Sequence, residues 1–399
     1  MDVSFTQEEQ DYRAQVQQFL TAHPPESFAT QGMDAGYGSG AYSHDFLVAL
    51  AKQGWLTQCW PLAFGGKALA YTYRLILLEE LAKAGAPFAA LNSCDQTADV
   101  IIEFGTDALQ AEVLPRIARG EATFWQGFSE PNAGSDLLAL RTEAVRDGDD
   151  YVINGHKIWS SNAGLADYGF VIARTARDAP RHKGVSAFIV PNRLPGIESR
   201  PINSLTGQPY HYEVFLDNVR VHKSYLLGEE NGGFPQLLKG LDADRFWARF
   251  YKPPYLRRFL NKLIHYANTE TRNGQRLSTD TAVRRQFATF STELDVLQTL
   301  FYRTGWMIGN DHPTPYETAM YKLQVDELGQ RIATFGVDLL GVHASSTSTD
   351  AAAPLSGEVA HIYQICWGQT IAGGTSEILR NTVATRGLGL PRPKRGPGS

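Results

Sequence analysis

The sequence predicts an α+β protein in which a helical domain, a small β domain and a second helical domain follow one another. Apolar residues recur at helical spacing up to about residue 122. From residue 123 to about 225 they fall in short β-branched or aromatic runs bounded by Gly, Asn, Asp and Pro. Helical spacing then returns and continues over residues 226–390. With 399 residues, 43% of them hydrophobic, the chain can form two or three domains.

The first domain, residues 1–122, is predicted to be entirely helical. Thr6 and Glu9 have the spacing of a capping box, so the first helix should begin there. Apolar residues at helical spacing predict further helices at 46–50, 75–81, 100–104 and 109–117.

The middle domain, residues 123–225, is predicted to consist of short strands. Runs rich in β-branched and aromatic residues stand at 151–153, 168–173, 185–190 and 212–221. Asn154-Gly155 has the composition of a tight hairpin turn, so we expect a turn there and a strand after it. That strand would present Trp159 beside Ser160 and Ser161.

Composition excludes several classes of protein and of site. The net charge of −5 and the pI near 6.1 argue against a nucleic-acid-binding surface. The three cysteines are far apart and lie in no ligand-like cluster, so neither a disulfide framework nor a metal site is predicted. No apolar run approaches the roughly 20 residues of a membrane helix, and no signal peptide is evident. We therefore expect a cytoplasmic protein, with a disordered Pro/Gly-rich tail at 391–399.

Two segments of the middle region contain groups suited to a flavin. In GFSEPNAGSD, residues 127–136, Ser129 and Ser135 flank a Pro-Asn-Ala-Gly turn in which Gly134 can leave backbone amides free for a ligand. In the second segment, YVINGHKIWSSNAG at residues 151–164, the Trp159 indole can stack on an isoalloxazine ring. Either segment alone would favour a structural interpretation, in which a Gly/Asn-rich surface loop is followed by a hairpin with a core tryptophan. Their occurrence together favours a flavin.

These segments resemble the acyl-CoA dehydrogenase family. The resemblance extends from residue 54 to residue 381 through motifs that stand in the family's order. In addition to the two flavin segments, they are GWLTQCWPLAFGG at 54–66, FGT at 104–106, LP at 114–115, LLGEENGG at 226–233 and QTIAGGTSEILRN at 369–381.

The resemblance implies a helical N-terminal domain, a middle β-barrel or sandwich domain and a C-terminal helical bundle. It also implies an FAD-dependent oxidation of an acyl-CoA, in which a carboxylate removes the α-proton and a hydride leaves the β-carbon. The implied partners are the acyl-CoA or an acyl-carrier-protein substrate, an electron-transfer flavoprotein or other acceptor, and further copies of the chain in a homodimer or homotetramer.

Residue by residue, the resemblance implies two sets of contacts. Arg272 lies in the region where the family has an Arg-x-x-Phe-Gly run, and it either substitutes for that contact or the contact is lost. Asp338 and Gly341 lie where the family has a Gln-x-x-Gly-Gly turn, and neither motif is matched in full. The other implied FAD contacts are Gln126, Phe128, Ser129, Gly134, Ser135, Trp159, Ser160, Ser161, Thr375 and Glu377. The implied acyl-CoA contacts are Ser135, Asp242, Arg245 and Gly374.

The general base departs from the family's usual pattern. Many members have a glutamate directly before the Gly-Thr-Ser of the last motif, where this chain has Gly373. Others have it just before an arginine on the helix after the middle domain, and that position is Asp244. Aspartate reaches about 1.5 Å less than glutamate, and proton transfer needs heavy atoms roughly 2.6–3.2 Å apart. Asp244 is the predicted base, although a surface pair with Arg245 or Lys239 is the alternative.

Three other functions are compatible with these residues. The first is a dehydrogenase acting on acyl groups held by a carrier protein, and the second is an oxygen-using flavoprotein similar to nitroalkane oxidases and amino-sugar N-oxygenases. The third is a non-catalytic subunit that binds flavin or a partner chain, because Gly373 and the shorter Asp244 both weaken the catalytic pattern.

Two further expectations concern the last domain. Pro253-Pro254 should kink or interrupt a helix that is usually continuous in the family. The helices over residues 281–341 have more apolar positions than one bundle face needs, so symmetric association should bury the surplus. The surplus positions are Phe287, Phe290, Leu294, Leu297, Leu300 and Phe301.

Overall fold

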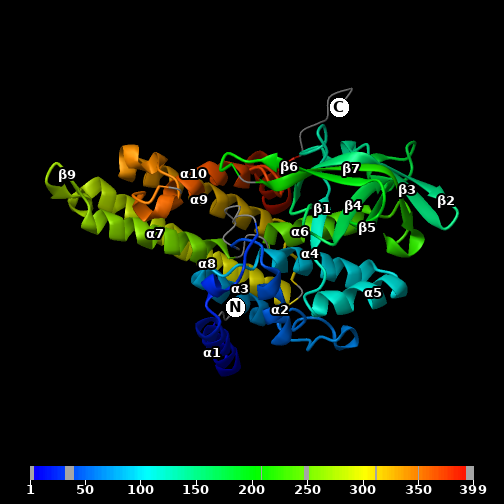
Figure 1. The fold of residues 1–399 in the computed structure, drawn as a ribbon, viewed down its shortest axis with the longest axis horizontal. Helices are drawn as coiled ribbons and strands as arrows, with labels where there is room; N and C mark the ends of the chain where they lie inside the picture. The colour runs from blue at the N-terminus through cyan, green and yellow to red at the C-terminus, as the bar shows by residue number, and fades with distance from the viewer. Residues whose placement is uncertain are drawn as a thin grey trace. The chain divides into compact units, whose positions relative to one another are not determined.

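The chain forms two compact units (Figure 1). The computed structural model describes residues 4–31, 40–207, 209–246, 251–310, 312–348 and 350–391. Arg13–Ala248 is called the sheet unit here, and residues 1–12 with 249–399 are called the helix unit. The predicted α+β class and the order of helices, sheet and helices are confirmed. The domain boundaries at 122 and 225 stay predictions, and the predicted tail at 392–399 lies outside the described residues.

The predicted capping box opens the first helix, α1 (Gln7–Ala22). The Thr6 amide donates to Glu9 Oε2 at 2.8 Å, and the Glu9 amide donates to Thr6 Oγ1 at 3.2 Å. Each side chain therefore satisfies an amide that the first helical turn leaves without a carbonyl partner.

The four other predicted N-terminal helices are all present in the sheet unit. They are α2 (His44–Lys52), α3 (Tyr71–Ala84), α4 (Ala89–Phe104) and α5 (Asp107–Ala118). A later helix of this unit, α6 (Phe234–Phe246), packs with α4, and α4 also contacts α5 and the first strand. None of the helices in the described ranges combines the length and apolar character needed to cross a bilayer.

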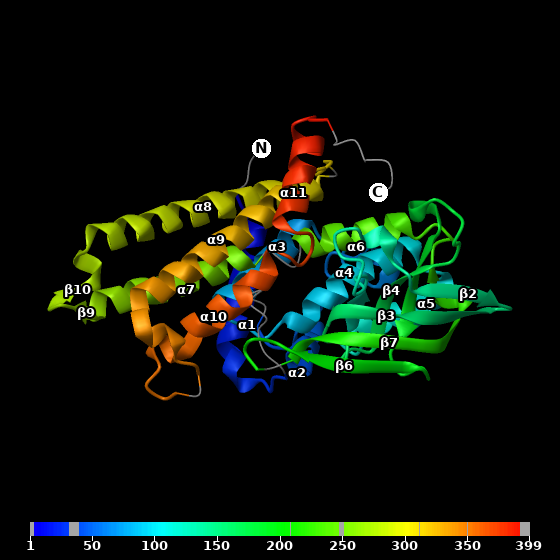
Figure 2. The same ribbon diagram turned by 90° about the horizontal axis from the view of Figure 1, so that it is seen from above.

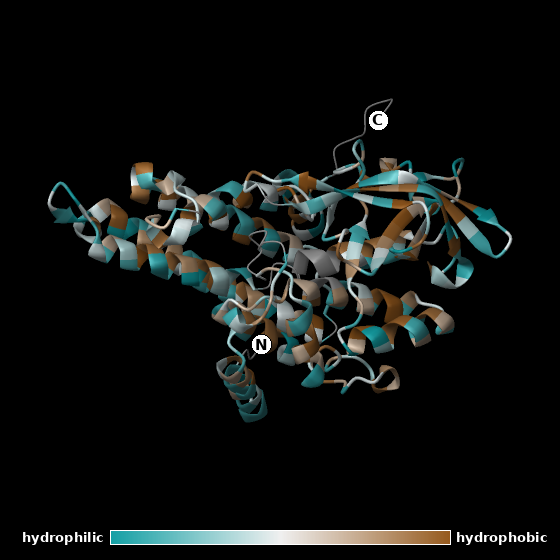
Figure 3. Cartoon of the chain, viewed as in Figure 1, coloured by the Kyte–Doolittle hydropathy of each residue, from teal (hydrophilic) through white to brown (hydrophobic). Residues whose placement is uncertain are grey.

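An eight-stranded sheet is built from the middle of the described chain (Figure 2). Its order is β6-β7-β3-β2-β4-β5-β8, with β1 pairing in parallel with β4. Half-buried and exposed residues alternate along most of β6, whereas β4 and β5 are buried over nearly their whole length. Figure 3 colours the strands by hydropathy, and the buried apolar residues form a core around Trp125, Tyr151 and Phe188. The strands are β1 (Phe124–Gly127), β2 (Glu143–Asp147), β3 (Asp150–Ser161), β4 (Tyr168–Arg174), β5 (Val185–Pro191), β6 (Ile197–Asn203), β7 (Pro209–His222) and β8 (Leu226–Leu227).

The predicted hairpin turn at Asn154-Gly155 is wrong. Both residues lie inside β3, and the turn that precedes this strand is at Gly148, whose φ is +64°. A Cβ on Gly155 would stand 2.2 Å from the Thr142 hydroxyl oxygen. Glycine is thus needed for close strand approach, at a register shift between β3 and β7, and not for a turn.

The helix unit is a bundle of long helices with a short hairpin. It contains α7 (Lys252–Thr269), α8 (Thr281–Gly309), α9 (Glu317–Leu340), α10 (Glu358–Gln369) and α11 (Ser376–Thr382). The helices α7, α8 and α9 pack against one another, and α9 also packs against α10 and α11. Strands β9 (Thr271–Arg272) and β10 (Gln275–Arg276) connect α7 to α8.

The expected interruption at Pro253 and Pro254 is present, because α6 ends at Phe246 and a separate helix, α7, begins at Lys252 with both prolines in its first turn. The prolines do not kink α7, since first-turn amides need no intrahelical acceptor. The apolar residues expected as a surplus on α8 are mostly buried within this chain. Phe287, Phe290, Leu294, Leu297 and Phe301 are all at most 9% exposed, so they do not argue for association.

Candidate active site

The sheet brings the two predicted flavin segments together. The Ile158 amide of β3 donates to the Ser129 carbonyl at 3.0 Å, which places the loop after β1 directly beside the end of β3. Within that loop, Glu130 and Ala133 exchange two backbone hydrogen bonds of 3.0 Å and close a tight turn. Ser129 is half-buried, and Ser135 is exposed. A Cβ on Gly134 would meet no protein atom within 4 Å, so the chain itself leaves this side of the loop open.

Trp159 is presented outward at a bulge in β3. Two residues, 158 and 159, oppose one residue of β7 between the pairs Lys157–Val214 and Ser160–Tyr212. At the bulge Trp159 has a φ of +61°, a left-handed conformation that costs a non-glycine residue about 1–2 kcal/mol. Its side chain is 58% exposed, which is unusual for tryptophan. The strand therefore presents an open indole face beside the Ser129 loop.

His211 of β7 lies under the edge of this indole, with ring centroids 5.9 Å apart. Burial lowers the pKa of His211 to about 4. The imidazole is therefore neutral near pH 7 and places no charge beside the indole.

Three other predicted flavin residues have side chains that face the protein. Phe128 is buried edge-to-face against Phe170, with centroids 5.0 Å apart. The side-chain Nε2 of Gln126 donates to Gln96 Oε1 at 2.6 Å. Ser160 is fully buried, because strand alternation turns it to the opposite face from Ser161, which is half-buried. Contact between Phe128 or Ser160 and a ligand would therefore use the backbone.

In the helix unit, Arg272 contacts the end of α9. Its Nη2 atom donates to the Leu339 carbonyl at 2.9 Å, next to Asp338. Gly341, with a φ of +59°, ends the helix there. The structure thus brings together the three imperfectly matched positions of the predicted FAD set.

The loop before α11 contains Gly373 and Gly374, with φ values of +70° and +106°. Thr375 caps α11 by accepting the Ile378 amide at 3.3 Å, and Glu377 is exposed in the first turn. A glutamate at position 373 would need a left-handed backbone, which favours glycine. The backbone at position 373 thus favours the glycine that the sequence has there.

A buried lysine holds this loop. Lys322 of α9 donates to the carbonyls of Gln369 at 3.0 Å and Gly374 at 2.9 Å, and it lies 3.1 Å from Asp326 Oδ2. Lys252 of α7 contacts the same carboxylate and donates to Gln369 Oε1 at 2.8 Å. Both lysines are at most 3% exposed.

Asp242, Asp244 and Arg245 lie in α6, which ends at Phe246. Their side chains fall outside what the structure describes, so their predicted roles stay predictions.

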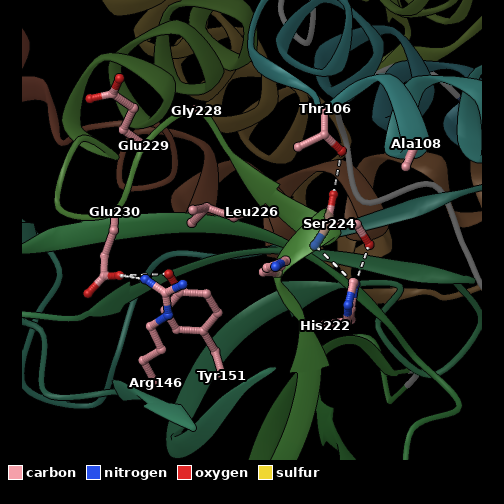
Figure 4. A pocket seen from close by; sticks show the side chains of 11 residues that line it. Thr106, Ala108, Arg146, Tyr151, His222, Ser224, Leu226, Gly228, Glu229 and Glu230 are labelled. Atoms are coloured by element: carbon pink, nitrogen blue, oxygen red, sulfur yellow. Dashed lines mark hydrogen bonds and ion pairs between the residues drawn. The ribbon is translucent and has the colours of Figure 1, made fainter. Parts of the chain in front are cut away.

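A cavity of about 450 Å³ lies elsewhere in the sheet unit (Figure 4). It is lined by none of the predicted site residues. Glu230 there accepts the Tyr151 hydroxyl at 2.8 Å and lies 3.6 Å from Arg146, so these polar groups are already paired. We assign the cavity no part in the site.

Comparison with known proteins identifies the family. Models of the N-terminal, middle and C-terminal domains of acyl-CoA dehydrogenases match residues 6–121, 126–219 and 231–388. The chain belongs to the acyl-CoA dehydrogenase family. It is 32% identical to acyl-CoA dehydrogenase FadE26 of Mycobacterium tuberculosis, over 99% of this chain and 100% of the relative.

Two solved structures are similar to this one. The first is described as the Tcur3481-Tcur3483 steroid ACAD, with a TM-score of 0.85, 29% identity, and coverage of 98% of this chain and 100% of that one. The second is the ChsE4-ChsE5 complex from Mycobacterium tuberculosis, with a TM-score of 0.83, 30% identity, and coverage of 98% and 100%.

The chain is accordingly an FAD-dependent acyl-CoA dehydrogenase, an oxidoreductase. The described residues fit a flavin, because the open indole of Trp159 and the uncovered side of Gly134 face away from the chain's own atoms. When bound, FAD accepts the hydride that leaves the β-carbon.

Sequence reasoning missed the residues that support this site from behind. Lys157, Gln96, His211 and Lys322 were not singled out, although Lys157 lies inside the second flavin motif. Lys157 could have been found from its place in a predicted strand, because a lysine that becomes buried there needs a charged or hydrogen-bonding partner.

Proposed function

We propose that this chain oxidises the α,β-bond of a bulky, steroid-type acyl-CoA, with Asp244 as general base. The observation that carries the proposal is the combination of Gly373 in a left-handed loop with a carboxylate at Asp244 on α6. Since position 373 has no side chain, the proposal takes the base from the family's other position, which is Asp244 on α6. One similar structure is described as a steroid ACAD, which supports a polycyclic acyl group.

In this proposal the sheet unit contributes the flavin contacts of its two flavin segments. Ser129, Ser135 and Ser161 donate hydrogen bonds to FAD, and Trp159 stacks on its ring. Gly374 lies near the thioester, in a loop whose carbonyl is tied down by Lys322. The proposed substrate-side contacts also include Asp242 and Arg245, and electrons leave to an electron-transfer flavoprotein.

Anaerobic titration of the yellow protein tests the substrate. Steroid side-chain CoA esters, short branched acyl-CoAs and linear acyl-CoAs are added separately while flavin absorbance is followed. We expect bleaching by the steroid esters at concentrations that leave the linear esters unreactive. Bleaching by linear or short esters alone would refute the substrate class and leave the reaction type intact.

A second function has a specific observation in its favour, namely that two similar structures are each described with two named chains. In this alternative, the chain is one subunit of a heteromeric dehydrogenase. It predicts that the purified chain alone is not bleached by any acyl-CoA and becomes active when a second family member is co-expressed. Light scattering of the chain alone and of the co-expressed pair distinguishes a homo-oligomer from a heteromer.

Trp159→Ala tests the flavin contact. Losing one stacked aromatic face should weaken FAD binding about tenfold, since aromatic stacking contributes about 0.5–1.5 kcal/mol and buried area adds to it. The dissociation constant of FAD from deflavinated protein, measured by fluorescence, reports the change. Val145→Ala, which shortens a similarly exposed apolar side chain of the same sheet at 57%, should leave the constant unchanged. Equal affinity in the parent and Trp159→Ala would remove Trp159 from the flavin site.

A further inference from the structure

A buried ion pair connects the two flavin segments on the side that faces the protein interior. Lys157 of β3 is fully buried, and Glu130, in the loop after β1, is 8% exposed. Lys157 Nζ donates to Glu130 Oε1 at 2.8 Å and to the Phe128 carbonyl at 3.2 Å. One ammonium group therefore holds the residues on both sides of Ser129.

Glu130 extends this connection to the far end of the loop. Its two carboxylate oxygens accept the Thr142 amide at 2.9 Å and the Arg141 amide at 2.6 Å. Burial favours the neutral form of Glu130, but Lys157 and these donors outweigh it and lower the pKa of the carboxyl. The carboxylate is thus charged in the fold and fixes the start of the loop to the residues that lead into β2.

Lys157, the other partner of this ion pair, lies next to the bulge that exposes Trp159. Lys157 makes the last regular β3–β7 pair before the bulge, and the next amide, of Ile158, donates to the Ser129 carbonyl. Beyond the bulge, the Asn162 amide donates to the Tyr210 carbonyl at 3.0 Å. A left-handed non-glycine residue persists only where its surroundings fix it on both sides. Lys157 and Ile158 provide that fixation on the N-terminal side of Trp159.

We propose that Lys157 is a positioning residue for FAD, which acts through Glu130 and the Phe128 carbonyl. It keeps the Ser129 loop and the Trp159 indole in the one arrangement that receives the flavin ring. Its effect is on FAD affinity, because the ammonium is buried and does not touch the ligand. The proposal rests on the flavin contacts of Ser129 and Trp159, and it is independent of Asp244 and of the acyl substrate.

Two variants of the full chain separate positioning from simple loss of stability. Lys157→Met removes the ammonium but leaves the Glu130 charge buried, so it should lower the unfolding temperature as well as weaken FAD binding. Adding Glu130→Gln removes that charge while keeping an acceptor for one amide. We expect the double variant to regain unfolding temperature yet to bind FAD at least tenfold more weakly than the parent, because the Phe128 carbonyl remains untied.

The measurements are the FAD dissociation constant and the unfolding temperature of the deflavinated protein. Ile153→Ala is the matched control, since Ile153 is fully buried on the same strand, belongs to the hydrophobic core and is none of the predicted flavin contacts. It should lower the unfolding temperature with less than a threefold change in FAD affinity. Parental FAD affinity in the double variant, or affinity that falls with stability in Ile153→Ala too, would overturn the proposal. Unchanged affinity in Trp159→Ala would overturn it through its premise.

Discussion

Asp244→Asn is expected to slow flavin reduction by the best acyl-CoA roughly 10² to 10⁴ fold, the scale of a lost general base. Asparagine keeps the size of the side chain but cannot accept the α-proton. FAD content and acyl-CoA binding should persist, because the flavin contacts belong to other residues. Anaerobic stopped-flow absorbance measures the rate, and flavin reduction at the parental rate would show that the base lies elsewhere.

Two further variants sharpen this prediction. Glu103→Gln removes an exposed carboxylate that pairs with Lys239 of α6, and it should leave the rate unchanged. Asp244→Glu adds one methylene, or about 1.5 Å of reach. A pocket adapted to the shorter carboxylate should lose activity with glutamate, whereas a pocket shaped for the family's usual base should gain it.

Asp326→Ala is expected to lower the free energy of unfolding by about 3–5 kcal/mol, the cost of breaking a buried ion pair by removing one partner. Asp326 is 2% exposed and contacts the ammonium groups of both Lys252 and Lys322. The substitution leaves two buried cations without this shared carboxylate. Denaturant unfolding followed by circular dichroism measures the change.

The adjacent residue gives a matched control for this prediction. Glu327 pairs with Arg380 at 2.8 Å, but both side chains are more than a third exposed. Solvent screens such a pair, so Glu327→Gln should cost at most about 1 kcal/mol. A loss below 1 kcal/mol in Asp326→Ala would show that the two lysines do not depend on this carboxylate.

Local sequence signals predicted much of the fold because the interactions behind them are local. The Thr6–Glu9 capping box involves residues three apart, so its hydrogen bonds follow from the first helical turn alone. The helices and strands likewise follow from apolar periodicity. The predicted hairpin at Asn154-Gly155 is wrong because the same dipeptide also suits a strand that must approach Thr142 closely, and Thr142 lies in a different segment, directly before β2.

In the candidate site, too, some residues can be predicted from local motifs and others are brought together only by long-range contacts. Ser129, Ser135 and Trp159 could be predicted as flavin contacts from their motifs alone, since each motif is a continuous stretch of sequence. The association of Arg272 with the end of α9 could not, because 67 residues separate it from Leu339. Nor could the apolar residues of α8 be recognised as internal core, since periodicity gives the apolar face but not what covers it.

The sequence by itself determined the family, the order of helices and sheet, and the FAD cofactor. These depend on which residues are present and on their near neighbours in the chain. Only the tertiary structure decided that Lys157 ties Phe128 to Glu130, that Lys322 holds Gly374, and that the bulge at Trp159 turns an indole outward. A buried charge takes as its partner whatever group the fold brings within about 3 Å, and that choice is made across strands and helices rather than along the chain.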